Sequence, residues 1–262
     1  MRFLRICFFS LFAVLSSSAY ALTDAQMFEV MRFMAEKPKP DVTVNGIGIY
    51  VYDGINSLDA LGPYRVFMTA GLKPFLIAKN RGTITTNDNL KIQVDKSIAD
   101  VTKLDILVIP GGAAETVAQT KDPVTLAWIQ QIDANSLYTT SVCTGSWILG
   151  AAGLLQGKNA TSNWYRAKQI LAKYGATFQP KRWVQDGKYW TSAGVSAGID
   201  MALAIVVNLY SHDYAQAVML DLEYDPQPPI RGGSLAKTAL VPRRNMTWMY
   251  DFYLLDSFVR SK

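Results

Sequence analysis

The chain has 262 residues, of which half are hydrophobic and 18% are charged, and this composition suits one large globular domain. The formal net charge is +5, but the Lys and Arg residues are scattered along the chain and form no basic stripe. Nucleic-acid binding is therefore disfavoured, because a phosphate backbone needs such a stripe.

The first 21 residues are typical of a secretory signal peptide. A basic start precedes an apolar stretch from Ile6 to Leu15, and the segment ends in Ala19-Tyr20-Ala21, a small-x-small cleavage pattern. The apolar stretch is too short to span a bilayer, and no later apolar run has spanning length. We therefore expect a mature chain that begins at Leu22, is periplasmic or secreted, and is not held in a membrane.

Cleavage would leave the mature chain with one thiol. Cys7 lies within the expected leader, so Cys143 would remain alone and no internal disulfide could form. An unpaired thiol in an oxidising compartment is a liability that structure alone does not require. This favours a chemical role for Cys143.

The pattern of apolar runs and turn residues divides the chain into four parts. These are a signal peptide at 1–21, a helix and linker at 22–44, a main domain at 45–230 and a C-terminal extension with a helix at 231–262. In chain order, the expected elements are a helix at 24–36, a stiff link at 37–40, a strand at 46–52, a helix at 58–70, a strand at 74–78, a hairpin at 83–94, a strand at 104–109, a helix at 123–134, a strand from 138 that turns at Cys143 into a helix from Gly145, a helix at 164–174, a hairpin at 182–191 and a helix at 196–210.

Alternating strands and helices predict an α/β fold. The sheet should be mainly parallel with helices on both faces, and its reactive crevice should lie at the carboxyl ends of the strands.

Cys143 lies where a strand turns sharply into a helix. This strand-turn-helix elbow presents the sulfur on a tight turn, where the free N–H groups and positive dipole end of the helix favour thiolate over thiol. The alternative is a buried cysteine that acts as a small hydrophobe. The elbow favours the reactive thiol, since a structural cysteine has no need of one.

Three segments should meet in the crevice, because each follows a predicted strand. Asp59 opens the helix after the first strand, Gly111, Gly112 and Ala113 follow the third, and Cys143 ends the fourth. The glycine N–H groups could form an oxyanion-type site. Alone, Asp59 would more often be a helix cap or a solvated carboxylate, and the glycines a plain turn.

Several motifs together resemble the DJ-1/PfpI superfamily, and its isonitrile hydratase-like branch in particular, over roughly residues 45–229. They are Pro110-Gly111-Gly112, Val142-Cys143-Thr144-Gly145, Leu149-Gly150-Ala151-Ala152-Gly153-Leu154-Leu155, Gly157-Lys158-Asn159-Ala160-Thr161, the run from Thr191 to Asp200, and Glu223-Tyr224-Asp225-Pro226-Gln227-Pro228-Pro229. The resemblance implies a flavodoxin-like three-layer sandwich that is usually a homodimer, with a cysteine nucleophile and no metal or organic cofactor. It also implies catalytic roles for Cys143, Thr144 and Asp59.

One position departs from the pattern of the relatives. Asn163 stands where related sequences often carry a histidine, and Thr144 stands where the protease-like branch has its histidine. The single histidine, His212, falls in a break between two late helices, where a surface or capping residue is expected. A Cys-His protease dyad is therefore unsupported. Asn163 could hydrogen-bond a substrate, but it cannot act as a base.

With a Cys-His dyad unsupported, the chemistry left to the site is hydration by a thiol and a carboxyl group. Ionising both is costly, so the pair should share one proton, with Asp59 protonated when Cys143 is a thiolate. By resemblance, the substrate would be a small molecule, with an isonitrile giving an N-substituted formamide. The alternative is a non-catalytic binding protein in which Cys143 is oxidised or senses an electrophile.

The C-terminal run from Trp248 to Leu255 carries an apolar stripe at helical spacing. Such a stripe is more often part of a core than an interface, although two of them could pair in a dimer.

Overall fold

The computed structural model describes residues 22–34, 42–112 and 114–259, with no side-chain description beyond Leu254. The chain divides into two compact units, Met1–Lys37 and Pro38–Lys262. The first unit contains helix α2 (Asp24–Met34), close to the predicted helix. The expected signal peptide and the link at 37–40 lie outside the described residues.

The second unit is built on a seven-stranded sheet with the order β10-β11-β7-β6-β1-β2-β5 among the described residues. Every pairing is parallel except the antiparallel pair of β10 and β11 at one edge. The strands are β1 (Ile47–Tyr50), β2 (Phe75–Ala78), β5 (Lys96–Ser97), β6 (Ile106–Ile109), β7 (Tyr138–Val142), β10 (Trp183–Asp186) and β11 (Tyr189–Ser192).

The central strands are buried along their whole length. All residues of β1, β6 and β7 are buried, which explains their near-continuous apolar or small-residue sequences. Two small sheets lie beside the main one, and they pair β3 (Gly82–Thr85) with β4 (Lys91–Val94), and β8 (Asn159–Ala160) with β9 (Thr177–Phe178).

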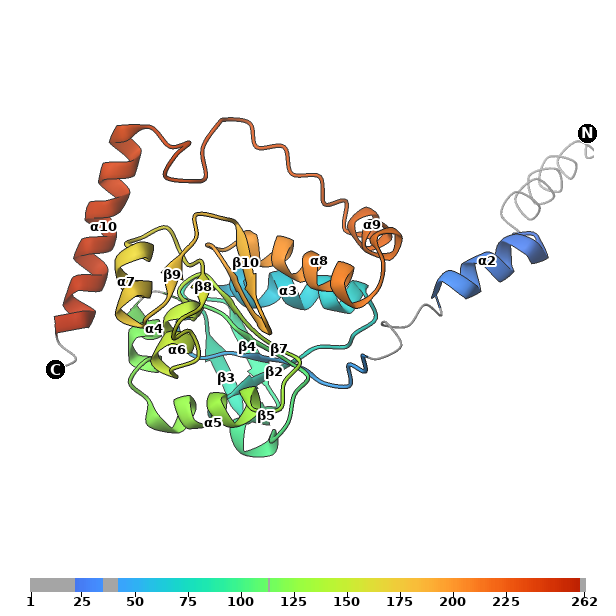
Figure 1. Cartoon of the computed structure of the whole chain (residues 1–262), viewed down its shortest axis with the longest axis horizontal. Helices are drawn as coiled ribbons and strands as arrows, with labels where there is room; N and C mark the ends of the chain where they lie inside the picture. The colour runs from blue at the N-terminus through green and yellow to red at the C-terminus, as the bar shows by residue number, and fades with distance from the viewer. Residues whose placement is uncertain (1–21, 35–41, 113, 260–262) are drawn as a thin grey trace, which may run out of the picture. The chain divides into compact units, whose positions relative to one another are not determined.

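Helices cover both faces of the main sheet (Figure 1). They are α3 (Ser57–Thr69), α4 (Ala114–Gln119), α5 (Pro123–Asp133), α6 (Gly145–Ala151), α7 (Ala167–Lys173), α8 (Ala197–Leu209), α9 (His212–Asp221) and α10 (Leu240–Val259). α3 packs against α8 on one face, and α5 packs against α6 on the other. The predicted α/β sandwich with a mainly parallel, flavodoxin-like sheet is confirmed.

Local signals explain where several helices begin. The side chain of Asp122 caps α5 by accepting from the N–H groups of Val124 and Thr125, and Pro123 fits the first turn. Ser211 caps α9 in the same way, and His212 is exposed at the start of that helix, as predicted. α7 begins at Ala167, three residues later than predicted. Arg166 has φ 45°, a left-handed conformation that cannot be part of a right-handed helix.

Among the described residues, no helix combines the length and apolar character needed to cross a membrane. α10 lies in the second unit and packs against α4, along the side of the domain that also holds α7 (Figure 1).

Candidate active site

Cys143 occupies a strained elbow between β7 and α6. Its φ is 60°, a left-handed backbone conformation that is uncommon for a residue with a side chain. Its N–H donates to the carbonyls of Ser192 and Ala193, at 3.1 Å each. Its carbonyl accepts from the hydroxyls of Ser146 and Ser162, at 3.2 and 3.1 Å. The surrounding hydrogen bonds therefore hold the strain in place.

Gly145 makes the elbow possible. A Cβ atom at this position would lie 2.0 Å from the carbonyl oxygen of Ile109 at the end of β6. Only glycine allows the first turn of α6 to approach β6 so closely. The Cys143-Thr144-Gly145 sequence is thus a steric requirement of the site.

Asp59 lies in the first turn of α3 and is fully buried. Its Oδ2 accepts from the N–H of Gly111 at 3.0 Å. Its Oδ1 has no hydrogen-bond partner of regular geometry, although the Cys143 thiol and the Val195 N–H lie near enough to lower its pKa. Asp59 is therefore not a solvated carboxylate, and its side chain holds the β6 loop rather than capping α3.

The glycine loop after β6 shapes the site through its N–H groups. Gly111 donates to Asp59, and Gly112 donates to the hydroxyl of Thr144 at 3.0 Å. A Cβ at Gly111 would lie 2.4 Å from that hydroxyl. Since both N–H groups are engaged within the protein, the two glycines position the side chains of Asp59 and Thr144, and the predicted oxyanion role stays a prediction. Ala113 lies outside the described residues.

Thr144 ties the elbow to its neighbours. Its hydroxyl donates to the Gly112 carbonyl at 3.0 Å, and it also hydrogen-bonds the hydroxyl of Thr116 on α4 at 3.0 Å. Tyr52, two residues after β1, extends this network with its own hydroxyl 3.0 Å from that of Thr116. Neither Tyr52 nor Thr116 was predicted, because no sequence pattern distinguishes them from other buried residues.

Asn163 contacts the sulfur directly. Its Nδ2 donates to Cys143 Sγ at 3.2 Å, and its Oδ1 accepts from the N–H of Tyr165 at 3.0 Å. Asn163 is 3% exposed. The structure thus brings Cys143, Asp59, Thr144 and Asn163 together around one sulfur atom, with Asn163 as a donor to the thiol.

Burial controls the protonation of the pair. It raises the pKa of Asp59 from 3.8 to about 7, against hydrogen bonds from Gly111, Cys143 and Val195. It raises the pKa of the Cys143 thiol well above the usual range, with a further rise from the Asp59 charge and opposing hydrogen bonds led by that from Asn163. The predicted low thiol pKa is not met, because desolvation outweighs the dipole of α6, a helix of only seven residues. The two groups still oppose each other's ionisation, as expected for a pair that shares a proton.

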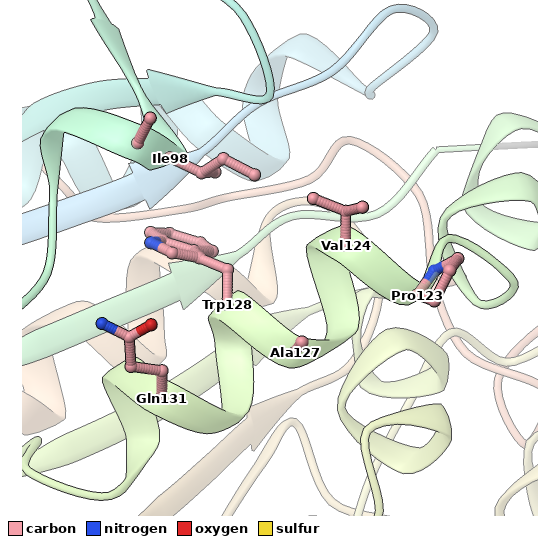
Figure 2. A pocket seen from close by; sticks show the side chains of 7 residues that line it. Ile98, Pro123, Val124, Ala127, Trp128 and Gln131 are labelled. Carbon is pink, nitrogen blue, oxygen red and sulfur yellow. The ribbon is translucent and has the colours of Figure 1, made fainter.

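A groove elsewhere on the described part of the chain lacks the residues of this site. An open groove of about 550 Å³ lies between α5 and the short 3₁₀ turn Ile98–Asp100, and its lining is mainly apolar, with Trp128 and Val124 among the residues shown (Figure 2). None of the predicted site residues lines it. Within the described ranges, no three His, Cys, Asp or Glu side chains are grouped as metal ligands.

Comparisons with known proteins agree with this geometry. The model of the DJ-1/PfpI family matches residues 46–208. Isonitrile hydratase of Pseudomonas putida is 39% identical over 189 residues, which cover 72% of this chain and 82% of that protein. A crystal structure of a ThiJ/PfpI family protein from Pseudomonas syringae superposes with a TM-score of 0.79 at 33% identity, covering 92% of this chain and 97% of the other. Drosophila melanogaster DJ-1beta, at 22% identity, a TM-score of 0.64 and coverage of 70% and 100%, supports the fold alone.

Proposed function

The chain belongs to the DJ-1/PfpI family, and we propose that it is a cysteine-dependent enzyme that adds water to a small uncharged molecule, with isonitriles as the first candidates. The observation that carries the proposal is that a carboxyl group and an amide both lie at the Cys143 sulfur. The buried Asp59 carboxyl lies close to the Cys143 thiol and keeps one oxygen free of any regular hydrogen bond, and the Asn163 amide donates to the sulfur. A nucleophile and a proton carrier are thereby held together.

In the proposed reaction, the Asp59 carboxylate first takes the thiol proton. The sulfur then bonds to the terminal carbon of the isonitrile, and Asp59 returns the proton to that carbon, which gives a thioimidate. Water adds to this carbon and protonates the nitrogen. Cleavage of the carbon–sulfur bond returns the thiol and releases an N-substituted formamide.

Asp59 suits this role because its pKa is raised to about 7 by burial. A carboxyl with a pKa near neutrality can both accept and donate a proton at physiological pH. Thr144 supports the reaction by fixing the glycine loop that holds Asp59.

The test is turnover of a panel of small isonitriles, followed as formamide release. Wild-type protein should be active, and Cys143→Ala and Asp59→Asn should be inactive. Asp53→Asn is a matched control, because Asp53 lies in the loop just before α3 and its carboxylate accepts from the Thr85 N–H at 2.8 Å. Loss of activity in the control alone, or full activity of Cys143→Ala, would overturn the proposal.

The alternative is a binding protein in which Cys143 is oxidised or senses an electrophile. The high thiol pKa caused by burial favours only the non-catalytic part of this alternative, since a protonated thiol is a weak nucleophile toward substrates, oxidants and electrophiles alike. A folded protein with no turnover on any isonitrile, but with stoichiometric Cys143 modification by an electrophile, would support this function instead.

Export and dimer formation belong to the same proposal. Export is supported by the signal-like pattern of residues 1–21 and is tested by N-terminal sequencing of secreted protein. A homodimer is supported by the resemblance, and the exposed apolar side chains of α10, Trp248, Met249 and Phe252, offer a surface for it. Light scattering of the purified protein tests the oligomeric state.

A further inference from the structure

α10 is fixed over the segment that carries Asn163. Leu254 is 2% exposed and packs in a cluster with Val117, Trp147, Tyr165 and Ile170. Also on α10, the Asp251 carboxylate accepts from the Tyr165 hydroxyl at 2.6 Å and from the Arg166 guanidinium at 2.7 Å. Asp251 and Arg166 thus form an ion pair. An apolar contact and a charge pair together set the register of the helix.

This register brings Tyr250 to the active site. Its ring centroid lies 4.9 Å from that of Trp164 and 5.2 Å from that of Tyr165, the two residues that follow Asn163. The Tyr250 hydroxyl lies near the Asn163 side chain, since this amide lowers the pKa of Tyr250 against the larger effect of burial. The register therefore places a residue more than a hundred positions after Cys143 beside the group that contacts the sulfur.

The Asn163 amide has one hydrogen left for such a neighbour. Oδ1 accepts from the Tyr165 N–H, and Nδ2 carries two hydrogens, one directed at Cys143 Sγ and the other available to the Tyr250 hydroxyl. Space is also limited, since a Cβ on Gly194 would lie 3.2 Å from Nδ2. The contacts with Cys143 and Tyr165 favour one orientation of the amide, which leaves its second Nδ2 hydrogen for a neighbouring acceptor.

We propose that Tyr250 is a positioning residue of the Cys143 site: its hydroxyl accepts one N–H of the Asn163 amide and thereby directs the other onto the sulfur. The inference rests on the proposed function only in taking this sulfur as the reacting atom. Its test measures the reactivity of the thiol directly. The role of Tyr250 can therefore fail while the proposed enzyme activity holds, and the enzyme activity can fail while the role of Tyr250 holds.

The test is the rate of Cys143 alkylation by iodoacetamide as a function of pH. The hydrogen bond from Asn163 stabilises the thiolate, so Tyr250→Phe, which keeps the ring and its packing, should raise the thiol pKa. Alkylation at about pH 8 should become threefold to tenfold slower. In an Asn163→Ala background, Tyr250→Phe should have no further effect, because it acts through the amide.

The matched control is Tyr253→Phe on the same helix, whose side chain is 61% exposed and which should leave the pH profile unchanged. Thermal unfolding followed by circular dichroism verifies that each variant is folded. If Tyr250→Phe overlays the wild type, the proposal is wrong. If it speeds alkylation in both backgrounds, α10 is a cover over the site and Tyr250 does not orient Asn163.

Discussion

Gly111 donates its N–H to one oxygen of the Asp59 carboxyl at 3.0 Å, the other oxygen has no regular hydrogen bond, and the Cys143 thiol lies near enough to the carboxyl to lower its pKa. The loop after β6 therefore holds a side chain from α3 close to the thiol that follows β7. Because the carboxyl and the thiol are both buried, the charge of either one raises the pKa of the other. Asp59 and Cys143 therefore titrate together, and the pKa values of the site are properties of the pair.

Replacing Asp59 with Asn should make Cys143 easier to ionise. The Asp59 charge raises the pKa of the thiol, so its removal should lower that pKa and speed alkylation by iodoacetamide about tenfold near pH 8. The measurement is the alkylation rate from about pH 6 to 10, with Asp53→Asn as control. A profile that overlays the wild type would mean that the two groups are not coupled.

The same substitution should change how stability depends on pH. The Asp59 pKa is about 7 in the folded protein and 3.8 in the reference state, so between these values the folded state binds the extra proton. The free energy of unfolding should therefore fall by about 1.4 kcal/mol per pH unit through this window and level off above pH 7. The stabilisation is complete below about pH 4.

Asp59→Asn lacks this titration, so its stability relative to the wild type should rise from pH 4 to pH 7.5 by at most about 4 kcal/mol. Urea unfolding of both proteins across that range measures the difference. A difference independent of pH would show that the Asp59 carboxyl is not desolvated.

The strain at Cys143 should reverse the usual order of alanine and glycine. At φ 60°, glycine has no Cβ penalty, so Cys143→Gly should be more stable than Cys143→Ala by about 1 kcal/mol. Ala204→Gly within α8 is the comparison, and it should destabilise by a similar amount. Equal or inverted stabilities of the two Cys143 variants in chemical unfolding would argue against backbone strain.

Asn163→His tests the departure from the relatives' pattern. If Cys143 and Asp59 suffice, a ring base is unnecessary, and turnover should stay within roughly tenfold, about 1.4 kcal/mol of barrier. If the wild type is nearly inert and the histidine variant gains about 100-fold, position 163 is instead one where a general base has been lost. The measurement is formamide release, with the folded state verified by circular dichroism.

The sequence predicted the parts of this site that repeat a local pattern. The elbow at Cys143, the helix that begins before Asp59 and the glycine loop all follow buried strands, and neighbouring parallel strands bring their ends together. Asn163 was found only through its position in a motif, and its contact with the sulfur needed the structure.

Other features depended on distances that sequence does not encode. The high thiol pKa results from burial by several elements, and so a local helix-dipole argument predicted the wrong direction. From the sequence, the apolar stripe of α10 could belong to the core or to an interface. In the structure, one part of the stripe is buried and another part is exposed. Leu254 is buried, whereas Phe252 is 77% exposed.

The separation of Cys143 and α10 along the chain also has a consequence for biosynthesis. Cys143 is translated about 100 residues before Tyr250, which at ordinary rates is on the order of 5–20 s. Throughout that interval the nascent chain carries its thiol without the helix that later packs against Trp147 and Tyr165. The elements around Cys143 are thus less covered, and more open to oxidants and electrophiles, before α10 is made than after it.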